Sequence, residues 1–257
     1  MVFNYFDMLS GAPILLPNIG HVRSPKLREI YPTIGIGYVE YNVYLNLLSW
    51  DKDKIMEYVR TLGYKSADKL NKPVFDAFDV VTIIRDIRES YREVLSFFMS
   101  EELVWDESHR RYLAVTKSDN SEPVGEINRD NFEGVRQAIL QLNYIGVDKD
   151  DAPIGHSTEK SKELWERTQA FLKKQAESSQ HEDKPEYHLS NVISKLCVAH
   201  PSYNLINVPE LTIFQVYDAF FQVGYMRSVD LSERIFSIHG GENFSFEDWF
   251  KPILKNI

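Results

Sequence analysis

The chain has 257 residues, a single cysteine and a formal net charge of -9 at pH 7. This length is enough to bury a sizeable core, and Cys197 has no second cysteine with which to form an intramolecular disulfide, which favours a reducing compartment. The acidic excess argues against general binding of nucleic acid, because such binding requires neutralisation of phosphates. The apolar runs are far shorter than the roughly 18 residues of a membrane span, and no basic secretory region begins the chain. These features predict a cytoplasmic protein.

The first segment, residues 5–38, is dense in glycine and proline and predicts extended chain and turns rather than a long helix. Within it, residues 13–17 are a candidate strand, and residues 21–23 could form the returning strand after a short turn. Ser24 followed by Pro25 has the pattern of a helix N-cap and first helical residue. A short helix is therefore expected after residue 25.

Three helices are predicted between residues 38 and 98. Apolar residues recur at three- and four-residue spacing over 38–48, which predicts a helix with one buried stripe. A second helix begins at Asp51 or Asp53 and ends near Gly63. A longer third helix covers 75–98, with its apolar residues on one face.

The pattern then changes to short runs that favour strands. Residues 103–105, 111–116 and 124–127 are separated by polar turn sequences, which predicts a small antiparallel meander. Asn128 or Asp130 can cap the helix that follows, which carries apolar residues as far as Leu142.

The remainder of the chain contains more helices around a polar stretch. Residues 160–176 predict a charged helix, and residues 177–188 are polar enough to predict a solvated linker. Beyond it, helices are expected over 189–198, over about 210–225 and near 246–254.

These elements predict a mainly α protein with a small antiparallel β meander, of the α+β class. The expected organisation is an N-terminal helical domain over residues 1–176, a linker over 177–188 and a helical C-terminal subdomain over 189–257.

The sequence contains no self-sufficient catalytic, metal or nucleotide motif. Cys197 and His200 have the spacing of half a zinc site, but no second pair follows, and Cys197 lies in an apolar run typical of a buried, unreactive thiol. Gly35 and Gly37 lack the third glycine and the lysine of a phosphate-binding loop. We therefore expect a non-enzymatic protein without cofactor or metal. The alternative is an enzyme that uses acids or a histidine beside the meander: Glu101, Glu102 or His109.

Two stretches resemble proteins of bacteriophage tail morphogenesis. Residues 13–30, with Ile34-Gly35 and the aromatic-rich helix after them, resemble the start of proteins from the tail-morphogenesis regions of phages of Gram-positive bacteria. Residues 211–220, with the later Trp249-Phe250, resemble the helical pattern of phage tail assembly chaperones.

This resemblance implies a virion assembly or structural protein that acts through protein contacts in the host cytoplasm or within the virion. Its partners would be the tape-measure or tail-tube protein, whose apolar surface it would protect, and neither nucleic acid nor membrane would be bound. The same features are compatible with a second hypothesis, a phage-encoded protein that binds and inhibits a bacterial partner. The candidate partner-binding residues are Phe214, Tyr217, Phe220, Phe221 and Tyr225 in one helix, and Ile14, Leu15 and Leu16 near the N-terminus.

Overall fold

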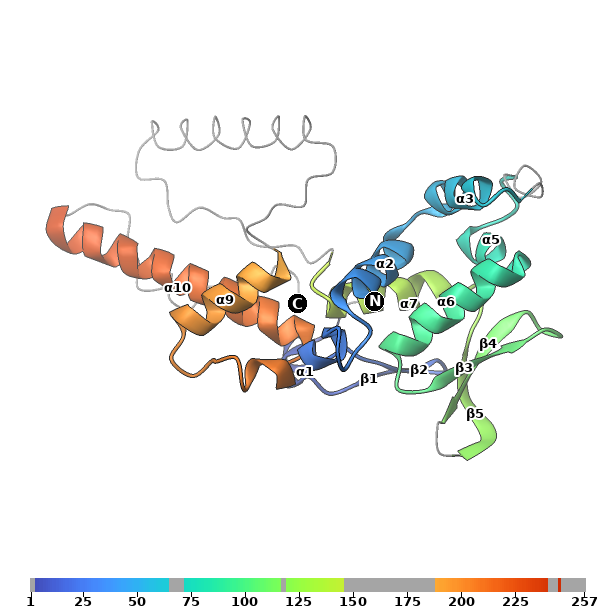
Figure 1. Ribbon diagram of the computed structural model, residues 1–257, viewed down its shortest axis with the longest axis horizontal. Coiled ribbons are helices and arrows are strands. Elements are labelled where there is room, and N and C mark those ends of the chain that lie inside the picture. Colours follow the sequence, from blue (N-terminus) through green and yellow to red (C-terminus); the bar gives the residue numbers. More distant parts are fainter. Residues whose placement is uncertain (1–2, 65–71, 117–118, 146–187, 240–244, 246–257) are drawn as a thin grey trace. The chain divides into compact units, whose positions relative to one another are not determined.

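The computed structural model describes residues 3–64, 72–116, 119–145, 188–239 and 245 (Figure 1). Over these residues the protein is α+β, with helices and two small antiparallel sheets, which confirms the predicted class. The expected helices over 160–176 and near 246–254 lie outside the described residues, as do residues 177–187 of the predicted linker.

Within the described residues the helices and strands follow the predicted order, except that α1 and η3 are additions and one predicted helix is divided into α5 and α6. The helices are α1 (Tyr5–Ser10), α2 (Tyr38–Ser49), α3 (Lys52–Thr61), α5 (Ala77–Ile83), α6 (Arg85–Phe98), α7 (Phe132–Leu142), α9 (Leu189–Ala199) and α10 (Ile213–His239), with the short 3-10 helices η1 (Leu27–Ile30) and η3 (Val208–Glu210). The strands are β1 (Ile14–Leu16), β2 (Gly20–Val22), β3 (Glu102–Asp106), β4 (Arg111–Thr116) and β5 (Asp119–Ile127). No helix within the described part of the chain is both long and apolar enough to cross a membrane.

The chain forms two compact units. The first comprises Met1–Gly146 with Pro209–Gln215, and the second comprises Val147–Val208 with Val216–Ile257. The first three residues of α10 therefore belong to unit 1, and the rest of that helix belongs to unit 2.

Unit 1 contains both sheets. β3, β4 and β5 form the predicted meander, with Leu103 opposite Ala114 and Tyr112 opposite Ile127. β1 and β2 form a separate hairpin, which contacts β5 and α7. In addition, α6 packs on β3, α2 on α7 and α3 on α5. The aromatic core lies among these elements, and its largest fully buried rings are Tyr91, Phe98, Tyr112, Phe132 and Phe214.

Polar side chains deep in unit 1 bind the C-terminal end of α2. Arg136 on α7 is buried and donates from Nε to the carbonyl of Leu48 at 2.9 Å and from its terminal nitrogen to the carbonyl of Trp50. The hydroxyl of Tyr91 on α6 donates to the carbonyl of Leu47 at 2.8 Å. These groups satisfy carbonyls that have no partner within the helix.

The helix predicted over residues 75–98 is divided into α5 and α6, so the expectation of one continuous helix was wrong. The break lies at Ile84, whose backbone is extended with φ -96° and ψ 114°. It closes a run of β-branched residues, 80–84, and such side chains have low helix propensity. Asp76 caps α5 by accepting a hydrogen bond from the backbone nitrogen of Asp79 at 2.9 Å.

The start of α10 has a local capping box. The hydroxyl of Thr212 accepts from the backbone nitrogen of Gln215 at 3.3 Å, and the side-chain oxygen of Gln215 accepts from the nitrogen of Thr212 at 2.9 Å. The predicted end near residue 225 was wrong, because α10 continues through Gly224 to His239.

A second cap for α10 comes from the N-terminal segment. The hydroxyl of Ser24 accepts from the nitrogen of Phe214 at 3.1 Å, and the carbonyl of Pro25 accepts from the nitrogen of Ile213 at 2.9 Å. The expectation that Ser24 caps the helix after residue 25 was therefore wrong, because that 3-10 helix begins after Lys26. The two stretches that resemble phage proteins meet at this contact.

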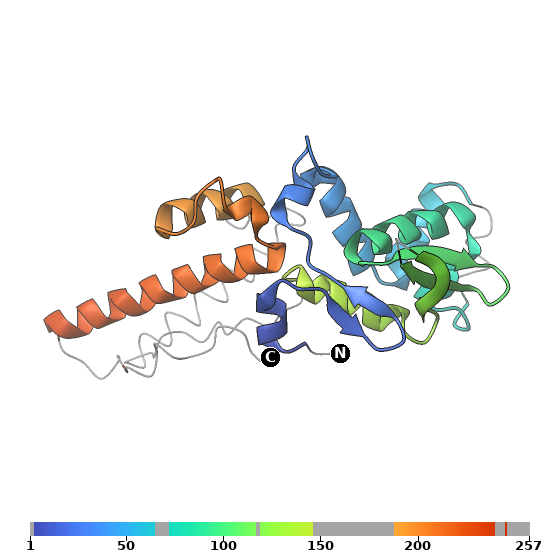
Figure 2. The same ribbon diagram turned by 90° about the horizontal axis from the view of Figure 1, so that it is seen from below.

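In unit 2, α9 lies beside the N-terminal half of α10, and the C-terminal half of α10 extends beyond it (Figures 1 and 2). The fully buried side chains of α9 include Val192 and Leu196, and those of α10 include Val216 and Val229. The opposite faces carry exposed residues, among them Ser194 and Lys195 on α9 and Arg227 and Arg234 on α10.

Candidate protein-binding surface

The structure separates the eight candidate residues into a buried pair and a more accessible group. Phe214 is fully buried in unit 1, with its ring centroid 6.4 Å from that of Tyr5 and 5.3 Å from that of Tyr144. Leu16 is buried as well. These two side chains therefore belong to the core, which leaves almost none of their surface accessible to a partner.

The N-terminal candidates follow the alternation of a strand. In β1 the side chain of Leu15 is 58% exposed, whereas its neighbours Ile14 and Leu16 are half-buried and buried. Only one residue of the three presents a large apolar surface, so this strand offers a narrow contact at most.

Four candidates lie in the part of α10 that belongs to unit 2. Tyr217, Phe220, Phe221 and Tyr225 are each half-buried, and the rings of Phe220 and Phe221 are in edge contact at 5.5 Å between centroids. Because they belong to unit 2 and the β1 residues to unit 1, the candidates form two separate groups.

Phe220 lines an apolar groove between α9 and α10 that has a volume of about 410 Å³. The volume lies within the range of about 300–1,000 Å³ that is usual for ligand sites. Residues of both helices line it: Ser194, Lys195, Leu196, Val198, Ala199, Phe220, Val223, Gly224 and Arg227. Sequence analysis missed the groove, although the isolated Gly224 inside an amphipathic pattern was an available signal.

Unit 2 also carries exposed apolar side chains. Val198 at the end of α9 and Ile206 in the following loop are 86% and 89% exposed. On the C-terminal half of α10, Leu231, Ile235 and Ile238 are exposed at four- and three-residue spacing, which places them on one face of the helix. A row of exposed apolar residues of this kind is typical of a surface that binds another protein.

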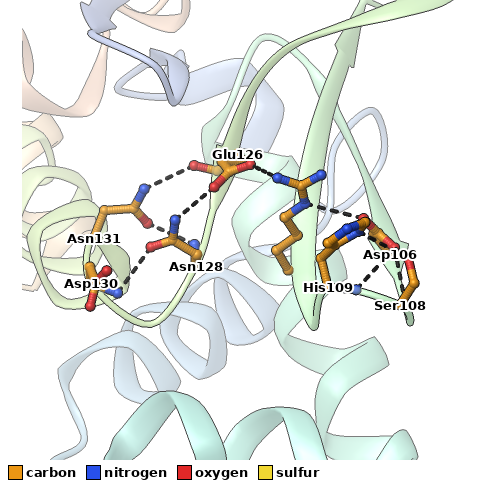
Figure 3. A network of polar contacts seen from close by, with 8 residues as sticks. Asp106, Ser108, His109, Glu126, Asn128, Asp130 and Asn131 are labelled. Carbon is orange, nitrogen blue, oxygen red and sulfur yellow. Dashed lines mark hydrogen bonds and ion pairs between the residues drawn. The ribbon is translucent and has the colours of Figure 1, made fainter.

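A polar network at the end of the β3–β4 hairpin is the arrangement in unit 1 that most resembles a catalytic site (Figure 3). Nδ1 of His109 lies 2.8 Å from a carboxylate oxygen of Asp106 and 3.0 Å from the hydroxyl of Ser108. In a serine–histidine–aspartate relay the hydroxyl and the carboxylate bind opposite ring nitrogens. Here both bind the same nitrogen, so the arrangement does not form such a relay.

The hydrogen bonds and ion pairs of this network stabilise the turn between β3 and β4. The hydroxyl of Ser108 and then the side chains of His109 and Arg111 hydrogen-bond the carboxylate of Asp106 and hold its pKa below the usual range. Arg111 also pairs with Glu126, whose other carboxylate oxygen accepts from Asn128 at 2.8 Å. An ionised carboxylate bound by donors cannot act as a general acid near neutral pH, and the network holds together the hairpin and the start of α7.

Glu101 also makes structural contacts. Its carboxylate is buried and accepts from the backbone nitrogen of His21 at 2.9 Å, while its second oxygen lies 2.7 Å from Nδ1 of the same residue. These bonds connect β2 to the segment before β3. The hydrogen-bonding capacity of Glu101 is used within the fold, and Glu102 is an exposed residue of β3.

The histidines and the cysteine are dispersed. Cys197 is half-buried on α9, and Nδ1 of His200 accepts from the backbone nitrogen of Ser202 at 3.3 Å. Among the residues that the structure describes, no three histidine, cysteine or acidic side chains are grouped so that they could hold a metal ion.

Comparison with known families gives a match to the C-terminal part of the chain. Residues 178–254 match the family described as YomV second domain, which is phage-derived. No curated protein and no solved structure matches the chain. The matched residues include all of α9 and α10 and therefore every residue named as lining the groove. The C-terminal part of this protein is therefore similar to a phage-derived domain, in agreement with the phage origin that its sequence predicts.

Proposed function

We propose that this chain is a non-enzymatic phage protein that acts through protein–protein contacts during virion assembly, in the manner of a tail assembly chaperone. It would bind the tape-measure or tail-tube protein in the host cytoplasm and cover apolar surface until assembly. The observation that carries the proposal is the row of exposed apolar residues on α10, within the region that is similar to a phage-derived domain.

Two further observations support contact rather than catalysis. The polar clusters of unit 1 have local structural partners, as the bonds of Asp106 and Glu101 illustrate. The apolar groove and the row formed by Leu231, Ile235 and Ile238 both lie in unit 2. Exposed apolar surface on a helix is what binding an aggregation-prone protein requires.

The test is co-expression with the tape-measure and tail-tube proteins of the same genome, followed by size-exclusion chromatography with light scattering. We expect one of them to co-elute with the chain or to gain solubility from it. Replacement of Leu231, Ile235 and Ile238 by serine should abolish the effect. Replacement of Ile34 and Val39, exposed apolar residues of unit 1, should leave it unchanged. A monomer that ignores both proteins would contradict the proposal, and co-purification of a bacterial protein instead would favour the host-interaction alternative.

A further inference from the structure

Gly224 occupies an unusual position in the middle of α10, where it lines the α9–α10 groove. Glycine weakens a helix relative to alanine because it loses more backbone freedom on folding. A Cβ built on Gly224 would have no other atom within 4 Å, so the packing of the chain does not require a glycine here. The absent side chain leaves space that is open from the groove, and such space permits the close approach of another molecule.

The charges at the groove point to the chemistry of that molecule. Its apolar lining includes Leu196, Ala199 and Phe220, and the cations Lys195 and Arg227 contribute to it from α9 and α10. Both cations are exposed, and neither forms an ion pair with another described residue. An apolar groove with two available cations, on a chain with a net charge of -9, complements a ligand that is apolar on one side and acidic at its edge.

The form of the groove favours a helix over a small molecule. Sites for small ligands enclose most of the ligand surface. In this groove Lys195, Val198, Gly224 and Arg227 are exposed, which leaves it open along one side. An open apolar groove between two helices commonly binds the apolar face of a third helix. The side chains of that third helix that enter the groove recur at three- and four-residue spacing.

We propose that the α9–α10 groove binds an amphipathic helical segment of a partner protein. The apolar face of the segment contacts Leu196 and Phe220 and passes close to Gly224, and carboxylates along its edge pair with Lys195 and Arg227. This inference rests on the proposed function and specifies the chemistry of the partner.

The experiment uses the full chain and a fluorescent synthetic helix with leucines at positions i, i+3, i+4 and i+7 flanked by glutamates. A second peptide has lysines in place of the glutamates. Fluorescence anisotropy should give at least tenfold tighter binding of the acidic peptide than of the basic one. The affinity of the acidic peptide should fall as the salt concentration is raised from about 50 to about 300 mM. The Debye length shortens from roughly 14 to roughly 6 Å over this range, so exposed ion pairs are screened.

The variant Gly224→Leu fills the groove with a residue of higher helix propensity, and we expect it to weaken binding of the acidic peptide at least tenfold. Gly134→Leu is the matched control, because Gly134 lies within α7 and its Cβ would likewise have no atom within 4 Å. The double variant Lys195→Glu with Arg227→Glu changes only exposed positions and should reverse the preference to the basic peptide. Thermal unfolding followed by circular dichroism establishes that each variant is folded.

Equal affinity of Gly224→Leu and the parent chain for the acidic peptide would overturn the inference, as would binding of oleate to the groove without binding of either peptide. The proposed function fails separately. If the peptide binds as expected but neither tail protein co-elutes, the inference about the groove is supported and the proposed tail partner is contradicted. If the tail proteins still co-elute with Gly224→Leu, the proposed function stands and the groove is not their site.

Discussion

The hydroxyl of Ser24 accepts a hydrogen bond from the backbone nitrogen of Phe214 at 3.1 Å, across 190 positions of the sequence. Both residues are buried, and this bond satisfies one of the nitrogens that have no partner in the first turn of α10. The N-terminal segment therefore takes part in starting the helix whose later turns form the groove.

Replacement of Ser24 by alanine should lower the free energy of unfolding by about 1–2 kcal/mol, because the buried nitrogen of Phe214 loses its acceptor. Urea unfolding followed by circular dichroism measures the change. Ser49→Ala is the control, since the hydroxyl of Ser49 is exposed and only donates to the carbonyl of Asn46. Equal losses in the two variants would contradict the capping role.

Replacement of Arg136 by methionine should cost roughly 3 kcal/mol of stability. The substitution preserves much of the side-chain length but leaves the carbonyls of Leu48 and Trp50 without their donor. Arg60→Met on α3 is the matched control, because Arg60 is exposed, and it should change stability by less than about 0.5 kcal/mol. A similar urea midpoint for both variants would show that the cap contributes little.

Glu29 should make stability depend on pH in the acid range. Burial acts to raise its pKa, but the hydrogen bond from Arg23, the backbone nitrogen of Lys26 and the charges of Arg23 and Arg28 together lower it from 4.5. The folded state therefore favours the ionised carboxylate, so this stabilisation is present above about pH 4.5 and is lost as the pH falls through the lowered folded pKa.

Glu29→Gln should cost roughly 1–2 kcal/mol at pH 7, because the charged contact in which both carboxylate oxygens accept from one terminal nitrogen of Arg23 is weakened. The difference from the parent chain should shrink at pH 3. Urea unfolding at both values measures it, with the exposed Glu57→Gln as control. A difference that is as large at pH 3 as at pH 7 would exclude titration of this carboxylate as the cause.

Two glycines should respond to alanine in opposite directions. In β5, a Cβ on Gly125 would lie 2.5 Å from the carbonyl oxygen of Asn18, so Gly125→Ala must displace the β1–β2 turn and should cost roughly 1–3 kcal/mol. Gly134 in α7 has open space, and Gly134→Ala should stabilise the chain by up to about 1 kcal/mol. Thermal unfolding of both variants checks the signs, and a stabilising Gly125→Ala would refute the close approach.

Much of the secondary structure could be predicted because its signals are local. The spacing of apolar residues predicted α2, α3 and α7, and β-favouring runs between polar turns predicted the β3–β5 meander, all of which the structure confirms. In each case the decisive residues lie within a few positions of one another. A break such as that at Ile84 is harder to predict, because apolar periodicity continues across it while the β-branched run 80–84 opposes it.

Of the candidate site, the sequence by itself determined only that α10 carries aromatic residues on an amphipathic helix. Tertiary structure decided that Phe214 is buried beside Tyr5 and Tyr144 while Phe220 lines a groove with α9. It also decided that Ser24 caps a helix far along the chain instead of the one beside it. The physical reason is that exposure and long-range hydrogen bonds depend on which segments pack together, and helical periodicity records only that a face is apolar, not what covers it.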